Sequence, residues 1–446
     1  MSTKYRHYWT LLRSTFWFVP GLMVVAAALL AGITLAADTA LRGIDLPGWM
    51  YAGGADGARA LLSTVAGSMV TVAGLGFSIT IVALVLASTQ FGPRLLTLFM
   101  RDVTSQATLG VFAGTFTFCV LVLRSIRGPG EGGAEFVPQV SITVALGLTL
   151  LSVGMLVYFF HHVAESIQAP KLVATVARDL DRAIDRLYPQ DVGYGGPEPA
   201  PADVPDPSAD PVIHAAANGY VQVVDDAALL AVATGHDLCV RLLIRPGLFV
   251  VRGNAIIAVR SPAPITPALE ARLRSTLIVG NARTAEDDLE FSVRQLVEIA
   301  LRALSPAIND PFTAMAAIDW LGAALARLAA KEWPSRFRYD EAGRLRVVAD
   351  VSTFGGVTHT IFSRIRHYGG ASPVVLNRLL EAVAAFGPHI QVAADRDLVR
   401  DETEAVMTMG RSLITSQADL AELDRRYRRA IEALGGAAGE ARPVAG

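Results

Sequence analysis

The sequence predicts a membrane α-helical bundle of four transmembrane helices, followed by a cytoplasmic α+β region with a small β-rich module. Four apolar runs in the first third of the chain predict the bundle. A change to alternating apolar and polar residues beyond residue 212 predicts the β-rich module. Hydrophobic residues make up 52% of the 446 residues and the mean hydropathy is +0.41, and most of this excess lies in the first third.

The second apolar run is the most informative. Residues 61–87 contain no charged side chain, and as a helix they are about 40 Å long. The hydrocarbon core of a bilayer is about 30 Å thick, so this helix crosses it with tilt or projects beyond it. Gly92 and Pro93 end the helix. The apolar residues between Arg94 and Arg101 then suit a short helix in the membrane interface.

The four spans form a predicted transmembrane domain at residues 1–163. They lie at residues 16–37, 61–87, 107–123 and 140–160. The first span exceeds the apolar core of a typical signal peptide, so we expect a retained anchor rather than a cleaved signal. Basic residues are more frequent before the first span and after the second and fourth than in the other loops. This asymmetry predicts that both termini are cytoplasmic.

The cytoplasmic region is predicted to contain helical, linker and β-rich parts. In order, these are a connecting helix at 164–192, a Pro/Gly-rich acidic linker at 193–211, the small β module at 212–262, a helical domain at 263–434 with a β-hairpin near 336–351, and a disordered tail at 435–446. Within the β module, residues 246–257 resemble the hairpin of barrel-sandwich domains that carry biotin or lipoyl groups. No lysine stands at the hairpin tip, so we expect no carrier role.

A capped turn between two helices is predicted at residues 300–314, which read ALRALSPAINDPFTA. A capping box at 284–287 is predicted to start the first helix. Asp310 and Pro311 suit the cap and first position of the second helix. In the alternative interpretation, the positive end of that helix holds an anion. The residues involved in the two interpretations are Arg302, Asn309, Asp310 and Thr313.

One face of the second span carries small residues. Gly67, Thr71, Gly74 and Ser78 recur at steps of four, three and four. Small residues let helices approach closely in lipid, so this pattern predicts a packing face. The alternative is a pore lined by small and hydroxyl groups, with Gln90 and Arg94 at its inner mouth. Arg94 and Arg101 would be interface anchors or, around a pore, a ring that favours anions.

Several functional classes have no support in the sequence. No charged residue lies near the middle of a span, whereas ion-coupled carriers usually keep one there. We find no P-loop, nucleophile elbow, CxxC or dinucleotide motif, and the eight histidines show no metal-binding spacing. We therefore expect no enzymatic activity, no cofactor and no metal. The net charge of −2 gives no reason to expect a nucleic-acid partner, and His161 with His162 suits a membrane interface or, alternatively, a pH switch.

Three phrases resemble a known family. They are ASTQFGPRLLTLFMRD at 87–102, LGVFAGTFTFCVLVLRSI at 109–126 and ALRALSPAINDPFTA at 300–314. Together they resemble the bacterial predicted membrane proteins classed as domain of unknown function 2254, over about residues 8–434. This resemblance implies a multi-pass protein of the inner membrane, and it implies no activity.

Two functional hypotheses follow. In the first, the protein is a homo-oligomeric ion channel or channel-like permease whose cytoplasmic region regulates conduction. In the alternative, it is a membrane-anchored scaffold or sensor whose cytoplasmic region binds a protein or small effector. The expected partners are the lipid bilayer, further copies of the chain and an unidentified ion or small-molecule effector.

Overall fold

The computed structural model of the chain consists of two compact units, Met1–Lys171 (unit 1) and Leu172–Gly446 (unit 2). The residues described are 16–42, 47–92, 102–129, 135–187, 198–200, 203–283, 288–331, 333, 335–369 and 372–435. The predicted interfacial helix, the predicted capping box at 284–287 and the predicted tail after residue 435 lie outside this range.

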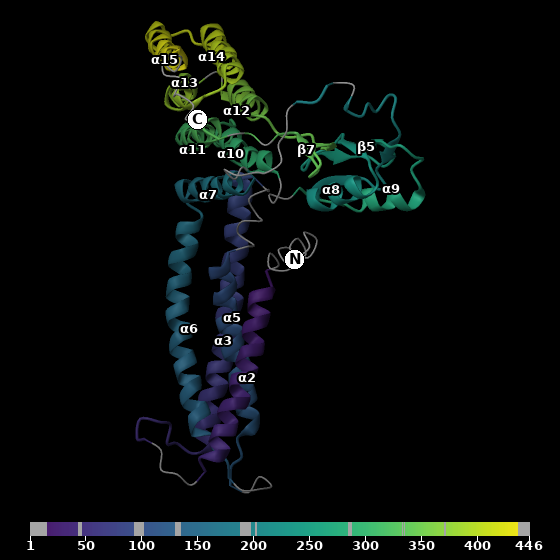
Figure 1. Cartoon of the computed structure of the whole chain (residues 1–446). Coiled ribbons are helices and arrows are strands. Elements are labelled where there is room, and N and C mark those ends of the chain that lie inside the picture. Colours follow the sequence, from purple (N-terminus) through teal and green to yellow (C-terminus); the bar gives the residue numbers. More distant parts are fainter. Residues whose placement is uncertain are drawn as a thin grey trace, which may run out of the picture. The chain divides into compact units, whose positions relative to one another are not determined.

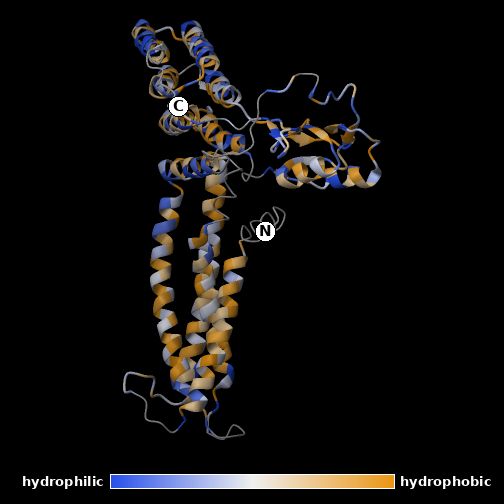
Figure 2. Cartoon of the chain, in the orientation of Figure 1, coloured by the Kyte–Doolittle hydropathy of each residue, from blue (hydrophilic) through white to orange (hydrophobic). Residues whose placement is uncertain are grey.

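The described part of unit 1 is a bundle of four antiparallel helices (Figure 1). They are α2 (Phe18–Ala40), α3 (Ala55–Phe91), α5 (Val103–Ser125) and α6 (Gln139–Ser166). Each is long and apolar enough to cross a membrane, and Figure 2 shows apolar residues along all four. The longest, α3, has 37 residues, which is about 55 Å of helix. The helices are longer than the predicted spans because helical structure continues where the hydropathy of the sequence falls.

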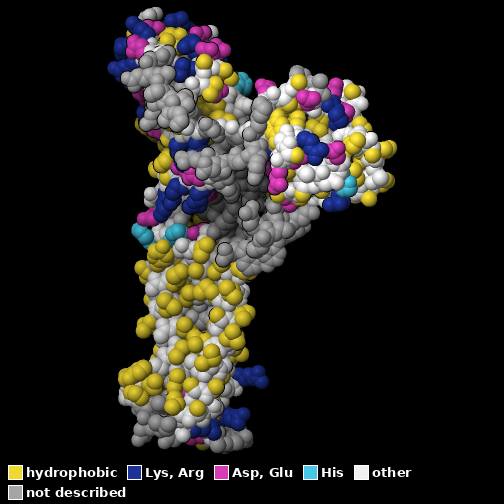
Figure 3. Space-filling view, viewed as in Figure 1, with side chains coloured by type: hydrophobic (Ala, Val, Ile, Leu, Met, Phe, Trp, Pro, Cys, Tyr) yellow, Lys and Arg dark blue, Asp and Glu magenta, His cyan; other side chains and the backbone are white. Residues whose placement is uncertain are grey.

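Helix α5 is the centre of the bundle. It contacts α2, α3 and α6, and Phe112 and Phe118 of α5 are fully buried, as is Phe159 of α6. Hydrophobic side chains also cover the visible outer face of the bundle (Figure 3). The interior of a single bundle is thus filled with side chains, and its outer surface suits lipid.

Two glycines let α5 approach α2. A Cβ placed on Gly114 would lie 3.3 Å from the Cβ of Ala27 and 3.4 Å from the carbonyl oxygen of Met23. A Cβ placed on Gly110 would collide with the side chain of Met23. These glycines act in packing within one chain.

A fifth helix of sufficient length and hydropathy, α11 (Pro311–Ala329), lies in unit 2. It contacts α10 (Leu289–Ala303), α12 (Phe354–Gly369) and α13 (Pro373–Phe386). Length and hydropathy therefore select five described helices, where the sequence analysis counted four spans.

The β-rich part of unit 2 contains two sheets. The first sheet consists of five strands, in the spatial order β1 (Val212–His214), β5 (Ala255–Arg260), β3 (Cys239–Leu242), β8 (Leu345–Val348) and β7 (Phe337–Tyr339). The second sheet consists of three strands, in the order β4 (Phe249–Val250), β2 (Gly219–Val224) and β6 (Leu277–Gly280). Neighbouring strands are antiparallel except β3 and β8, which are parallel. Both sheets share a core with α8 (Asp226–Gly235) and α9 (Pro267–Arg274).

This arrangement corrects four predictions. The hairpin near 336–351, assigned to the helical domain, adds β7 and β8 to the sheet of the β module. Residues 246–257 are not a hairpin, because β4 pairs with β2 whereas β5 pairs with β1 and β3. Helix α8 lies inside the predicted β module, where no helix was expected, and Asp225 caps it. Strand β6, placed in the helical domain, pairs with β2.

The connection between the units also differs from the prediction. Helix α6 runs through residue 164 to Ser166, and α7 (Ala169–Leu187) is a separate helix. The end of the predicted linker is ordered against the sheet, because Arg260 of β5 is 2.9 Å from the Asp210 carboxylate and donates to the Val204 carbonyl.

The rest of unit 2 is helical. Helices α10 to α13 are followed by the short helix η3 (Gly387–His389), α14 (Ala393–Leu413) and α15 (Gln417–Gly435). The side chain of Asp288, beyond the predicted capping box, accepts from Phe291 N and caps α10.

The approach of α5 to α2 gives a testable prediction. Gly114→Leu inserts atoms where Ala27 and Met23 leave no room, which we expect to destabilise the bundle by about 1–3 kcal/mol. Thermal melting in detergent measures the loss. Gly32→Leu, at a position with no atom within 4 Å of a Cβ, is the matched control; equal melting of the two variants would contradict the prediction.

Candidate functional site

The small-residue face of α3 points away from the rest of its own chain. Gly67, Thr71, Gly74 and Ser78 are all exposed. A Cβ placed on Gly67 or Gly74 would have no atom within 4 Å. Gly76, two residues further along, faces inward against Phe112 and Phe159. The four predicted residues therefore share one surface that the described part of the chain leaves uncovered.

Two hydroxyl groups on this surface donate to carbonyls of the same helix. Thr71 donates to the Gly67 carbonyl at 3.1 Å, and Ser68 donates to the Thr64 carbonyl at 2.8 Å. Their oxygens keep lone pairs that can still accept hydrogen bonds from outside. The small and hydroxyl residues run from residue 63 to residue 78, about 22 Å along the helix. The exposed face continues beyond them with the apolar residues Ile81, Val82 and Val85.

Polar contacts inside the bundle occur at three levels along α6. At one end, the carboxylate of Asp38 accepts from the backbone of Val140 and Ser141, at 2.8 and 3.0 Å, and from the Ser141 hydroxyl. In the middle, the hydroxyls of Thr115 and Ser152 are 3.1 Å apart.

At the other end, His162 Nε2 is 2.9 Å from the carboxylate of Asp102, which also caps α5 by accepting from Ser105 N. Charged partners therefore lie at the ends of the bundle and neutral hydroxyls at its centre. Neighbouring His161 is 3.0 Å from Glu165.

The predicted inner mouth is described only in part. Gln90 is exposed near the end of α3, and Gly92 follows with a φ of +108°. Arg94 and Arg101 lie outside the described residues.

In the turn before α11, two of the residues considered for ligand binding, Asp310 and Thr313, form the helix cap. The carboxylate of Asp310 accepts from the backbone N–H of Thr313 at 3.1 Å and from its hydroxyl at 2.5 Å. Asn309 has a φ of +51°, a left-handed conformation that asparagine tolerates. A carboxylate thus already occupies the positive end of α11.

A buried charge cluster joins the β-rich part of unit 2 to α10, and the sequence analysis missed it. The Glu290 carboxylate lies 2.7 Å from Arg245 and 2.9 Å from Arg294. Asp288 pairs with Arg283, and burial raises the pKa of the Asp288 carboxyl despite that partner. Gly247 has a φ of +87°, and a Cβ there would collide with Asp288.

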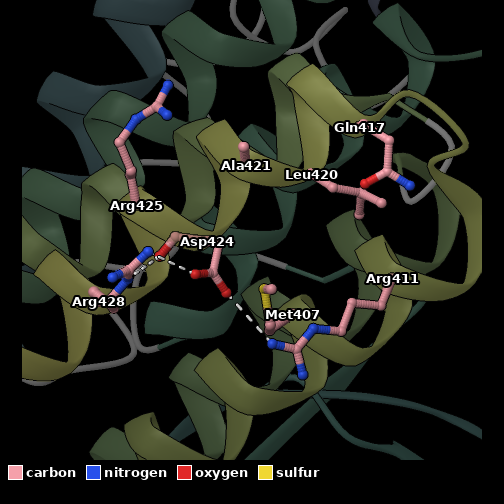
Figure 4. Close-up of a pocket in the computed structure, with 8 residues that line it drawn as sticks. All are labelled: Met407, Arg411, Gln417, Leu420, Ala421, Asp424, Arg425 and Arg428. Atoms are coloured by element: carbon pink, nitrogen blue, oxygen red, sulfur yellow. Dashed lines mark hydrogen bonds and ion pairs between the residues drawn. The ribbon is translucent and has the colours of Figure 1, made fainter.

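A surface groove lies between α14 and α15 (Figure 4). Its volume is about 480 Å³, and it is lined by Met407, Arg411, Gln417, Leu420, Ala421, Asp424, Arg425 and Arg428. Arg428 is 2.8 Å from the Asp424 carboxylate and Arg411 is 3.4 Å from it. Two guanidinium groups, those of Arg411 and Arg428, therefore lie at the Asp424 carboxylate, and Arg425 lines the groove but points away from Asp424 (Figure 4).

The described residues contain no group of three or more His, Cys, Asp or Glu side chains that could hold a metal ion. Both cysteines are free thiols. Burial raises the pKa of Cys239 to about 11, so this cysteine is a neutral thiol at physiological pH.

The sequence of the chain is similar to that of a family of membrane proteins. A family model described as "Predicted membrane protein (DUF2254)" matches residues 13–385. An uncharacterised protein of Mycobacterium bovis and one of Mycobacterium tuberculosis are each 33% identical to the chain over 430 residues, which is 95% of this chain and 81% of the relative. No solved structure matches the chain.

Proposed function

The chain belongs to the DUF2254 family of predicted membrane proteins, and from that premise we propose that it is a homo-oligomeric channel or channel-like permease of a bacterial inner membrane. In this proposal α3 lines the path and unit 2 regulates it. The observation that carries the proposal is the exposed face of Gly67, Thr71, Gly74 and Ser78, which no described part of the same chain covers.

A second copy of the chain is the partner that this face suits. Glycines expose backbone, and in lipid they favour close approach of another helix. Leucine and phenylalanine would fill a lipid-facing surface better than glycine does. Copies meeting through α3 would place hydroxyl oxygens around a shared axis, where they can replace part of an ion's water shell. The bundle interior is filled by Phe112, Phe118 and Phe159, which favours a path between copies over one through a single bundle.

The charge distribution favours conduction over ion-coupled transport. Asp38 and Asp102, whose carboxylates bind α6 and cap α5, lie at opposite ends of the bundle, and a neutral pair occupies its middle. Coupled carriers and proton relays use ionisable groups at mid-membrane depth. The proposal therefore assigns the chain no ion coupling and no catalytic step.

We place four spans in the membrane, with both termini in the cytoplasm, and leave α11 outside it. Charged side chains of α11 support this assignment. Asp319 pairs with Arg378 at 2.5 Å, and Arg327 pairs with Asp181 and Asp185 of α7. A lipid-facing helix would not keep such charges.

Topology distinguishes four spans from five. With four, reporters fused after residue 167 and after residue 435 lie on the same side of the membrane. A fluorescent reporter active only in the cytoplasm and a phosphatase active only outside it measure the side. Opposite sides for the two fusion points would place α11 in the membrane and contradict the assignment.

Conduction is tested with the purified full chain in liposomes. Gly74→Leu adds a bulky side chain to the proposed contact between copies, so we expect loss of ion flux together with loss of the oligomer in native mass spectrometry. Gly154→Leu, on an equally uncovered position of α6, is the matched control and should leave both unchanged. The proposal would be wrong if liposomes with the wild-type chain showed no flux of any common ion and the chain were a monomer in native mass spectrometry.

The groove between α14 and α15 favours a second candidate function, a membrane-anchored sensor that binds an acidic ligand. Its volume is in the range of small-ligand sites. Arg411 and Arg428 converge on Asp424, which an acidic ligand would displace. Function that survives replacement of unit 1 by an unrelated anchor would favour this candidate over the channel.

The sensor predicts charge-dependent binding. Arg411→Glu combined with Arg428→Glu reverses two groove charges, so we expect binding of a fluorescent oligoglutamate peptide to the full chain to be lost. Fluorescence anisotropy at low and physiological salt measures it. Arg364→Glu, an exposed position on α12, is the control, and equal binding by the groove variant and the wild type would exclude the groove.

A further inference from the structure

A histidine–carboxylate pair joins α12 to α14 and has no part in the functions proposed above. His359 Nδ1 lies 2.6 Å from Oε1 of Glu402. The Glu402 residue is 8% exposed, whereas 65% of the His359 side chain is exposed. Arg366 of α12 is 3.6 Å from the other carboxylate oxygen, so a positive charge accompanies the buried acid.

The contact fixes which ring nitrogen is reactive. An ionised carboxylate has no proton to donate, so the proton of the neutral ring lies on Nδ1. Nε2 then carries the lone pair. Because the carboxylate is held in the interface of two helices, it also fixes the plane of the ring, as carboxylates behind ligating or catalytic histidines do.

Two other histidine–carboxylate pairs among the described residues differ from this one. His161 pairs with Glu165 of the same helix, and that carboxylate is half-exposed. His162 uses Nε2 for its contact with Asp102, and its side chain is only 18% exposed. His359 alone among the three combines a buried partner from another helix with an exposed ring bound through Nδ1.

We propose that His359 is a phosphoryl-accepting histidine, with Glu402 as its positioning residue. The Nε2 lone pair attacks the phosphorus of a phosphoanhydride or phosphoramidate donor. The P–O or P–N bond to the leaving group breaks, and the leaving group keeps the electron pair. The proton stays on Nδ1, so the ring of the product is positively charged and the Glu402 carboxylate stabilises it.

This modification would act on unit 2 by charge. A phosphoryl group adds close to two negative charges on the exposed side of α12, beside a helix interface that already holds Glu402. Such a change can alter how α12 meets a neighbouring surface without any change in the buried core.

The test uses the full chain in detergent with potassium phosphoramidate as the donor. Mass spectrometry at neutral pH follows each histidine, and ³¹P NMR identifies the phosphorylated nitrogen. We expect His359 to be labelled at Nε2 roughly tenfold or more faster than His367, an exposed histidine on the same helix. Glu402→Gln should slow His359 by about 10–100-fold, change its pH–rate profile and leave His367 unchanged.

Two variants separate positioning from a general effect of charge. Glu402→Asp should restore part of the rate, and Glu404→Gln, at an exposed position of α14, should have no effect. Labelling of His359 no faster than His367, or labelling at Nδ1, would overturn the proposal. If Glu402→Gln melts at a much lower temperature than the wild type, the labelling rates of His359 and His367 in the wild-type chain still test the proposal.

Discussion

The bundle depends on one constraint: lipid offers no hydrogen bonds, so polar groups in unit 1 must find partners within the protein. The carboxylate of Asp38 binds the first turn of α6, Thr115 binds Ser152, and other threonine and serine hydroxyls donate to carbonyls of the preceding turn. These contacts fix the position of α6, which is otherwise largely exposed. Apolar packing alone would discriminate poorly between positions of α6, since lipid is as apolar as leucine.

The same constraint explains why the face of α3 can stay open. The hydroxyls of Ser68 and Thr71 on this face donate to backbone carbonyls, so their contact with lipid costs little and contact with another helix breaks no hydrogen bond. Glycines on both α5 and α3 allow another helix to approach closely, but the surfaces on which they lie differ. Residues of α2 in the same chain occupy the space beside Gly114, whereas the backbone at Gly74 is exposed on the outer surface of the bundle.

Hydropathy identified the four helices of unit 1 as candidate spans, because long uncharged apolar runs suit a bilayer. It did not locate their ends: α3 begins at Ala55 and α6 ends at Ser166, since helical structure extends past the apolar stretch. The small-residue face was predictable from its spacing. That Gly74 points outward and Gly76 inward follows only from the positions of α5 and α6.

The sheets of unit 2 were harder to predict. The pairing of β3 with β8 joins residues more than one hundred positions apart, and no local pattern encodes it. Helix α8 was missed because its apolar run suits a strand as well as a helix. Burial of Glu290 between two arginines, and of Glu402 behind His359, depends on contacts between distant segments.

The contact between the Asp38 carboxylate and the start of α6 has a consequence for how the protein is assembled. The carboxylate belongs to α2, and its partners belong to the start of α6, about one hundred residues later in the chain. Until α6 is in place, the Asp38 carboxylate has neither of those backbone donors. Completion of unit 1 is therefore coupled to the arrival of α6, which brings the two backbone donors to the Asp38 carboxylate.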